Sequence, residues 1–371
     1  MIKRIIEVYV PITTCTLRCS YCYITMKRLF DGPIPKVSFT PEFFRKALSK
    51  ERLGGSCLIG FCAGGETLLL PHLIDYIRVL LEEGHYVQVV TNGTISKRFD
   101  EFAQLPPDLT AHLFFKFSYH YTQLKERNLL EGFFANIKKV KDAGCSFTLE
   151  QVPSDDTISC QDEAIKLAQK YVGATPHITV ARDEHRIGGK LPIYTQQTRG
   201  EYKKTWGDKY NSALFDYKLS IFEQPRKEFC YAGDWSFTMD FCSGLMRQCY
   251  SSKTISRNIY KNIEKPIHFC AVGHHCPEPH CYNGHLFLSF GDIPEVPAPK
   301  HADLRNRICA DGTEWLQPEM KAFMNSKLYE TNKEYSKIKK ALVDFENVIT
   351  PVYFKVAKPF VKIKKMLLKK K

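Results

Sequence analysis

Three cysteines stand close together near the start of the chain, in the stretch TTCTLRCSYCYITM at residues 13–26. They are Cys15, Cys19 and Cys22, and Tyr21 precedes the last of them. Four thiolates usually hold an iron–sulfur cube. If these three bind such a cluster, one iron keeps an open coordination position. A zinc knuckle is the alternative, but it needs a fourth Cys or His ligand, and none stands nearby in the sequence.

A second group of chemically capable residues lies in FCAGGETLL, at residues 61–69. Gly64 and Gly65 would let the backbone approach a ligand without a side chain in the way. The carboxylate of Glu66 can accept a charge-assisted hydrogen bond from an ammonium group. Taken alone, Gly-Gly-Glu would indicate a turn. Its position after an apolar run favours a functional interpretation.

The elements that position these residues follow from the pattern of the first half. Short runs rich in Val, Ile, Phe and Tyr predict buried strands, and segments with helical spacing separate them. Gly84 and Gly144 follow two of these helices, as a helix-ending glycine does. Six strand–helix units predict an α/β fold with a parallel sheet that closes only part of a barrel. The expected strands are 4–10, 56–62, 86–91, 112–119, 145–152 and 176–182.

In such sheets ligands bind at the carboxyl ends of the strands. The three cysteines follow the first expected strand, and Gly-Gly-Glu follows the second. The stretch VVTNGT, residues 89–94, ends the third; on local chemistry it is a turn made by Asn92 and Gly93. We therefore expect the cysteines at the mouth of the partial barrel.

Cys15-x3-Cys19-x2-Cys22 after a first strand, with an aromatic residue before the last cysteine, resembles the signature of the radical S-adenosylmethionine (SAM) superfamily. The resemblance implies that the three thiolates hold a [4Fe–4S] cluster whose fourth iron binds the amino and carboxylate groups of SAM. It also implies reductive cleavage of SAM to a 5′-deoxyadenosyl radical, which abstracts hydrogen from an unactivated carbon. The residues implied to contact SAM are Gly64, Gly65, Glu66, Thr91, Asn92 and Ser118.

The residues after Ser118 do not identify the class of substrate. Tyr119 and His120 follow it, whereas many peptide-modifying relatives have an aspartate and a glycine there. His120 either faces the substrate or is an ordinary core or surface histidine.

A second group of cysteines, beginning at Cys230, resembles the auxiliary SPASM and twitch domains of this superfamily. Ile267 stands where the first cysteine of the later block is expected, and Cys309 could complete a site from a distance. The resemblance implies at least one auxiliary [4Fe–4S] cluster. Its expected ligands are Cys230, Cys249 and Cys281, with Cys276 as the fourth. The alternative is a zinc site, which the histidines of GHHCPEPHC at 273–281 would suit.

These patterns divide the chain into four segments: 1–185 as the partial barrel, 186–225 as a helical bridge, 226–310 as the auxiliary domain and 311–371 as C-terminal helices. Within the last, residues 318–346 are expected to form one amphipathic helix. Tyr335, Ile338, Leu342 and Phe345 recur there at three- and four-residue steps.

The C-terminal tail carries much of the positive charge. Residues 351–371 contain eight lysines and no acid, so the rest of the chain carries +5 of the total +13. Nucleic-acid binding is therefore not expected. Val356, Phe360, Ile363 and Leu367 recur at helical steps, which is typical of a helix at an anionic membrane interface. The alternative is a helix packed on the protein with a solvated lysine end.

The chain has no run of 18 apolar residues and no signal-peptide pattern at its start, and 14 cysteines without an export signal favour metal binding over disulfides. Together with the resemblance, these features lead us to expect a cytoplasmic radical SAM oxidoreductase or maturase that receives electrons from a flavodoxin or ferredoxin. Its substrate is a peptide or protein, although strand one leaves no room for an amino-terminal leader-binding module. The other substrate class is a sugar or lipid-linked saccharide. A non-catalytic iron–sulfur or zinc protein is a third possibility, which the Gly-Gly-Glu motif disfavours.

Overall fold

The computed structural model describes residues 1–30, 32–185, 191–250, 256–274 and 276–349. Within these residues nine strands form one sheet, in the order β6-β5-β4-β3-β2-β1-β7-β8-β9. The strands are β1 (Arg4–Val10), β2 (Cys57–Ala63), β3 (Tyr86–Thr91), β4 (Leu113–Ser118), β5 (Ser146–Gln151), β6 (His177–Ile178), β7 (Ser236–Asp240), β8 (Leu245–Arg247) and β9 (Ser256–Asn258).

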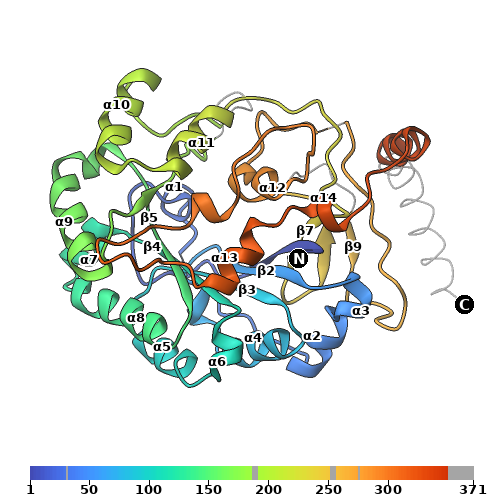
Figure 1. Cartoon of the computed structure of the whole chain (residues 1–371), viewed down its shortest axis with the longest axis horizontal. Helices are drawn as coiled ribbons and strands as arrows, with labels where there is room; N and C mark the ends of the chain where they lie inside the picture. The colour runs from blue at the N-terminus through green and yellow to red at the C-terminus, as the bar shows by residue number, and fades with distance from the viewer. Residues whose placement is uncertain (31, 186–190, 251–255, 275, 350–371) are drawn as a thin grey trace, which may run out of the picture.

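Helices follow the strands and lie around the outer side of the sheet, where Figure 1 shows α2, α4, α5, α8 and α9 along its rim. In chain order the helices are α1 (Tyr23–Met26), α2 (Pro41–Ala47), α3 (Lys50–Leu53), α4 (Leu73–Glu82), α5 (Ser96–Phe102), α6 (Pro107–Thr110), α7 (Tyr121–Glu126), α8 (Leu130–Asp142), α9 (Gln161–Val172), α10 (Arg199–Tyr210), α11 (Ala213–Ile221), α12 (Gly284–Phe290), α13 (Pro318–Asn325) and α14 (Leu328–Thr331). Residues 337–349 are also helical, and short 3₁₀ turns are η1 (Thr67–Leu69), η2 (Asp155–Cys160) and η4 (Ala302–Leu304).

The expected α/β fold with six parallel strands is confirmed. Strands β1 to β6 pair in parallel with their sequence neighbours, and the glycines at 84 and 144 follow α4 and α8 with φ near +85°. The sixth strand is shorter than the expected 176–182, because the ladder ends after Ile178. The backbone N–H of Ala181 instead donates to the hydroxyl of Tyr202 on α10, at 3.1 Å.

Alternate residues of each strand face opposite sides of the sheet. The outward side chains, such as Val8, Phe61 and Phe117, join α4, α8 and α9 in the main hydrophobic core. The inward positions are more polar and include Glu7, Lys116 and Glu150 on β1, β4 and β5. The interior of the partial barrel is therefore lined by charged groups.

The second half of the chain extends the same sheet. β7 pairs in parallel with β1 on the side opposite β2, and β8 and β9 follow as antiparallel strands. Arg4 of β1 forms an ion pair with Asp234 at 2.9 Å, and its guanidinium lies 3.9 Å from the centre of the Phe269 ring. The division into four segments stays a prediction, whereas the sheet runs through two of them without a break.

The prediction of a single helix over residues 318–346 is wrong. The structure has α13, α14 and the helix 337–349 in its place. Ile338, Leu342 and Phe345, expected on one amphipathic face, are exposed. The tail at 351–371 lies outside the described residues. Among the described helices, none is both long and apolar enough to span a bilayer.

Candidate active site

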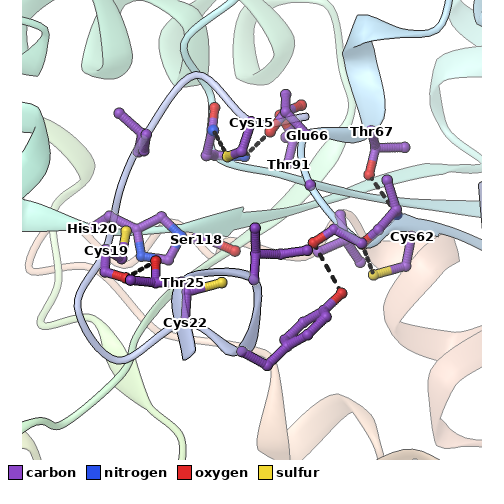
Figure 2. Close-up of a pocket in the computed structure, with 18 of the residues that line it drawn as sticks. Cys15, Cys19, Cys22, Thr25, Cys62, Glu66, Thr67, Thr91, Ser118 and His120 are labelled. Atoms are coloured by element: carbon purple, nitrogen blue, oxygen red, sulfur yellow. Dashed lines mark hydrogen bonds between the residues drawn. The ribbon is translucent and has the colours of Figure 1, made fainter. Parts of the chain in front are cut away.

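The three cysteines lie on the loop between β1 and α1 and line one cavity of about 170 Å³. Figure 2 shows the loop curving around this cavity with Cys15, Cys19 and Cys22 on it. The loop is closed by a hydrogen bond from the N–H of Cys22 to the carbonyl of Cys19, at 3.2 Å, and the Thr25 hydroxyl donates to the same carbonyl at 2.6 Å.

Burial raises the pKa of all three thiols. The charges of Cys22 and Cys15 raise the pKa of Cys19 further, so the three sulfurs lie within electrostatic reach of one another. A cationic metal centre offsets such a penalty, because thiolates are the form that binds metal. Three clustered cysteines beside an open cavity are a donor set that fits an iron–sulfur cluster.

The Gly-Gly-Glu turn after β2 packs directly on the cysteine loop. The N–H of Gly65 donates to the carbonyl of Ile12 at 2.7 Å, and the N–H of Glu66 donates to that of Thr14 at 3.0 Å. A Cβ on Gly65 would overlap the Thr14 carbonyl, so this position must be glycine. Gly64 also lines the cavity, and Tyr23 donates to its carbonyl at 2.9 Å.

Glu66 is buried and held by three donors. Oε1 accepts from the Thr91 hydroxyl at 2.7 Å and from the N–H of Leu68 at 3.0 Å. Oε2 accepts from the N–H of Asn92 at 2.8 Å. Burial raises the pKa of Glu66, and these three bonds oppose the rise. Since a carboxylate has about four acceptor positions, one remains after these three bonds, and Glu66 lines the cavity.

Asn92 connects the end of β3 to the cysteine loop. Its side-chain amide donates to the Thr16 hydroxyl at 2.9 Å and points to the sulfur of Cys15 at 3.5 Å. Thr91 and Asn92 both line the cavity. The turn expected from local chemistry is thus also a support for the first cysteine.

Ser118 and His120 reach the cavity from the end of β4, and Figure 2 places both beside the loop. Nδ1 of His120 lies 2.8 Å from the hydroxyl of Tyr21. Burial lowers the pKa of His120 to about 4, so the ring is neutral at neutral pH. Because His120 lines the cavity, it faces the cavity instead of the outer surface.

Cys62 and the charged interior of the barrel were not singled out by the sequence. Cys62 lines the cavity, and its thiol interacts electrostatically with Glu7 and Lys116. Lys116 is 3.0 Å from Glu150, which also pairs with the buried Arg305. Burial lowers the pKa of Lys116 to about 7. The alternation of β2 and β4 is the signal that would have placed these side chains inside.

Cys281 is the common neighbour of the predicted auxiliary cysteines: it packs against one apolar cluster with Cys230 and against another with Cys249. Burial is the main cause of the raised pKa of Cys230, and the charges of Asp292, Cys249 and Cys281 add to it. The pKa of Cys281 is likewise raised by burial and then by Cys249 and Cys276. The four come from different places: before β7, after β8 and before α12.

Two other cysteines lie elsewhere. Cys309 is not near this group: its thiol donates to the carbonyl of Val172 at 3.3 Å inside the main core. Its suggested role as a distant ligand is therefore wrong. The causes that raise the pKa of Cys270 are burial and then Glu346, not the other cysteines.

The zinc alternative gains no support in the described part of the chain. No three His, Cys, Asp or Glu side chains there are grouped so as to hold a single metal ion, and this holds for the cysteines of both groups as well. His274 bonds to Asp344 at 2.8 Å, and the ring of His280 lies 4.3 Å from that of Phe222. His275 lies outside the described residues.

Residues 9–152 match the model of the Radical SAM superfamily. This range includes the three cysteines, Gly-Gly-Glu, Thr91, Asn92 and Ser118. No curated protein matches the sequence significantly.

Three solved structures illustrate what the fold is similar to. SuiB of Streptococcus suis bound to S-adenosylmethionine is 12% identical, with a TM-score of 0.48 over 71% of this chain and 65% of that one. Native anSMEcpe with bound AdoMet is 14% identical, with a TM-score of 0.48 over 69% and 78%. TYW1 with a lysine-pyruvate adduct is 14% identical, with a TM-score of 0.36 over 56% and 73%. The chain spans about two thirds of the length of SuiB.

Proposed function

We propose that this chain is a radical SAM enzyme that abstracts hydrogen from an unactivated carbon of its substrate. One observation carries the proposal: three cysteines, Gly-Gly-Glu, Thr91–Asn92 and Ser118 reach the same cavity from the ends of β1, β2, β3 and β4. When bound, a [4Fe–4S] cluster supplies the electron that cleaves SAM to methionine and the 5′-deoxyadenosyl radical. A non-catalytic metal module would have no use for the adjoining carboxylate and glycines.

The protein's own residues hold and orient the reactants. Cys15, Cys19 and Cys22 would ligate the cluster, and Asn92 fixes the first of them. The free acceptor position of Glu66 suits the ammonium of SAM, since a charge-assisted hydrogen bond is among the stronger ones. Ser118 would contact the ribose, as the resemblance implies.

The substrate would bind on the interior side of the cavity. Cys62 and Ser118 mark where the cavity borders the inward faces of β2 and β4, and Glu7, Lys116 and Glu150 lie on that interior. Buried charges favour a substrate with polar groups, which peptides and saccharides both supply. We place a peptide or protein first and a sugar or lipid-linked saccharide second.

We further propose that Cys230, Cys249, Cys276 and Cys281 hold one auxiliary [4Fe–4S] cluster. The shared packing of Cys281 with Cys230 and with Cys249 supports the grouping, and Cys276 joins it through its electrostatic effect on Cys281. Such a centre could take an electron from a substrate radical, which would make the net reaction an oxidation. A flavodoxin or ferredoxin would deliver the reducing electron.

Anaerobic reconstitution with iron and sulfide, followed by dithionite and SAM, tests both proposals. We expect 5′-deoxyadenosine from the wild type and none from Cys15→Ala/Cys19→Ala/Cys22→Ala. That variant should bind about four fewer irons than the wild type. The same loss is expected for a second triple variant, Cys230→Ala/Cys249→Ala/Cys281→Ala.

The two proposals fail separately. The proposed enzymatic activity would be overturned if wild-type protein fully loaded with iron neither binds SAM in calorimetry nor cleaves it. If Cys230→Ala/Cys249→Ala/Cys281→Ala binds as much iron as the wild type, only the proposal of an auxiliary cluster is overturned. Cys57→Ala/Cys145→Ala, which changes two core cysteines, is the matched control and should keep both clusters.

A further inference from the structure

The helix at residues 337–349 is fixed on the protein by one polar face. The side-chain amide of Asn347 donates to the carbonyls of Ala271 and Val272 at 2.9 and 3.0 Å, and Asp344 accepts from the N–H of His274 at 3.0 Å. Val343 is buried on the same side. Figure 1 shows this helix, in dark red, at the edge of the molecule.

The opposite face is apolar and exposed. Ile338, Leu342, Phe345 and Ile349 are 76%, 62%, 64% and 44% exposed. Their steps of four, three and four residues put them in one narrow stripe along the helix. Because the polar face fixes the rotation of the helix, the stripe cannot turn inward. A contiguous apolar stripe of this kind marks an interaction site.

The sequence beyond the helix repeats the pattern of the stripe. Val356, Phe360, Ile363 and Leu367 each stand 18 residues after a member of the stripe, in the same order and spacing. Pro351 stands between the two sets, so the repeat is a pattern of the sequence and the second set is counted separately from the helix. Eight lysines and no acid accompany this second set.

We propose that the stripe of Ile338, Leu342, Phe345 and Ile349 docks on the surface of an anionic lipid bilayer. Apolar side chains that enter the headgroup boundary beside a lysine-rich segment are the pattern of interfacial binding. Each lysine near an anionic surface adds attraction. This inference is independent of the proposed function and concerns where the protein works.

Vesicle flotation of the full-length protein tests the proposal. We expect binding to phosphatidylcholine vesicles containing phosphatidylglycerol, weaker binding to phosphatidylcholine alone, and loss of binding as salt is raised. Leu342→Ser/Phe345→Ser should reduce the partition coefficient at least about tenfold. The control is Ile308→Ser/Ile158→Ser, since these apolar residues are exposed at 68% and 38% elsewhere, and it should bind as the wild type does.

A tryptophan in the stripe gives a second readout that does not depend on the serine variant. Trp206, Trp235 and Trp315 are all fully buried, so Phe345→Trp would be the one water-accessible tryptophan among the described residues. We expect its emission to shift to the blue with anionic vesicles and to be quenched by brominated lipid.

Several outcomes would overturn the proposal. Flotation of the serine variant at the wild-type level would assign binding to the tail alone. Shielding of the new tryptophan from acrylamide without vesicles would mean that the tail covers the stripe. A concentration-dependent dimer that the serine variant abolishes would make a second copy the occupant.

Discussion

At the scale of single residues, Glu66 offers the sharpest test of the proposed SAM site. Its carboxylate is buried, accepts from three donors, and belongs to a residue that lines the cavity. We expect Glu66→Gln to weaken SAM binding about 10- to 100-fold, since a hydrogen bond to a charged group contributes about 1.5–3 kcal/mol. Calorimetry on the reconstituted protein measures this, with iron content unchanged. Glu101→Gln, on α5, is the control, and equal affinity in both variants would contradict the role.

His85 gives a prediction about pH. It is fully buried, accepts from the N–H of Cys57 at 3.1 Å and bonds to the carbonyl of Leu48 at 2.8 Å. Burial lowers its pKa to about 4, below the value of about 6.5 expected in the unfolded chain. The unfolded state therefore binds more protons between these values, and stability falls as pH is lowered from about 6.5 to 4.

We expect the free energy of unfolding to drop between pH 7.5 and 5.0 by about 2 kcal/mol more in the wild type than in His85→Gln. Urea unfolding at the two pH values measures the difference. Glutamine can both accept and donate at this position, so the variant should fold. Parallel pH dependence of the two proteins would show that His85 is not the titrating group.

Residue types and spacing were enough to predict the three cysteines and the Gly-Gly-Glu motif, because both are local patterns. Cys62 and Lys116 could not be found in this way. Each is a single residue within a strand, and it matters because its side chain lies on the inward face of the sheet. The requirement for glycine at position 65 also comes from a tertiary contact, because the backbone of Gly65 lies against the loop at Thr14.

At the scale of elements, this contact between the turn after β2 and the cysteine loop leads to a prediction. A Cβ at Gly65 would overlap the backbone of Thr14, and a loop displaced there could not keep its cysteines in place. We expect Gly65→Ala to lose most of the iron of the cysteine loop, measured in a Cys230→Ala/Cys249→Ala/Cys281→Ala background.

Gly132 supplies the control for this substitution. It lies within α8, where a Cβ would meet nothing within 4 Å. Gly132→Ala should keep its iron and stabilise the protein by about 0.5–1 kcal/mol, since alanine is the better helix former. Iron loading of Gly65→Ala equal to that of Gly132→Ala would show that the loop tolerates the displacement.

The strands were predictable to within a residue or two where both faces are buried, as in β1 and β3. The helix expected over 318–346 failed because tertiary contacts override its periodicity. Ser326 accepts from the N–H of Ile2 at 3.3 Å, and Asn332 donates to the carbonyl of Lys3 at 2.9 Å. These bonds draw the chain across the start of β1 and interrupt the helix.

At the scale of the whole molecule, the pairing of β7 with β1 could not be read from the sequence. The two strands are more than 200 residues apart, and no local pattern specifies such a pairing. Its consequence is a shared core: Phe237, Met239 and Phe241 of the second half pack in the same cluster as Val8 and Phe61. β1 is thus an interior strand, with a neighbour on each side.

This shared core predicts that the barrel and the segment around β7 to β9 unfold together. Trp235 lies beside β7 and stacks on Tyr231, with ring centres 3.7 Å apart. Trp315 packs against Phe147 of β5, at 5.2 Å. Two variants that each keep one of these tryptophans, with the other two changed to phenylalanine, report on the two regions. In each variant we expect the urea midpoint by fluorescence to equal the midpoint by circular dichroism.

The comparison is made within each variant, so any loss of stability from the phenylalanine changes affects both signals equally. A Trp235 midpoint below that of the backbone signal would mean that the β7–β9 segment opens before the barrel. Coincident midpoints would mean that the strand carrying the cysteine loop and the strands beside the auxiliary cysteines are one cooperative unit. In that case a change that loosens either cysteine group acts on the stability of the other, because β1 and β7 separate only when the shared core is lost.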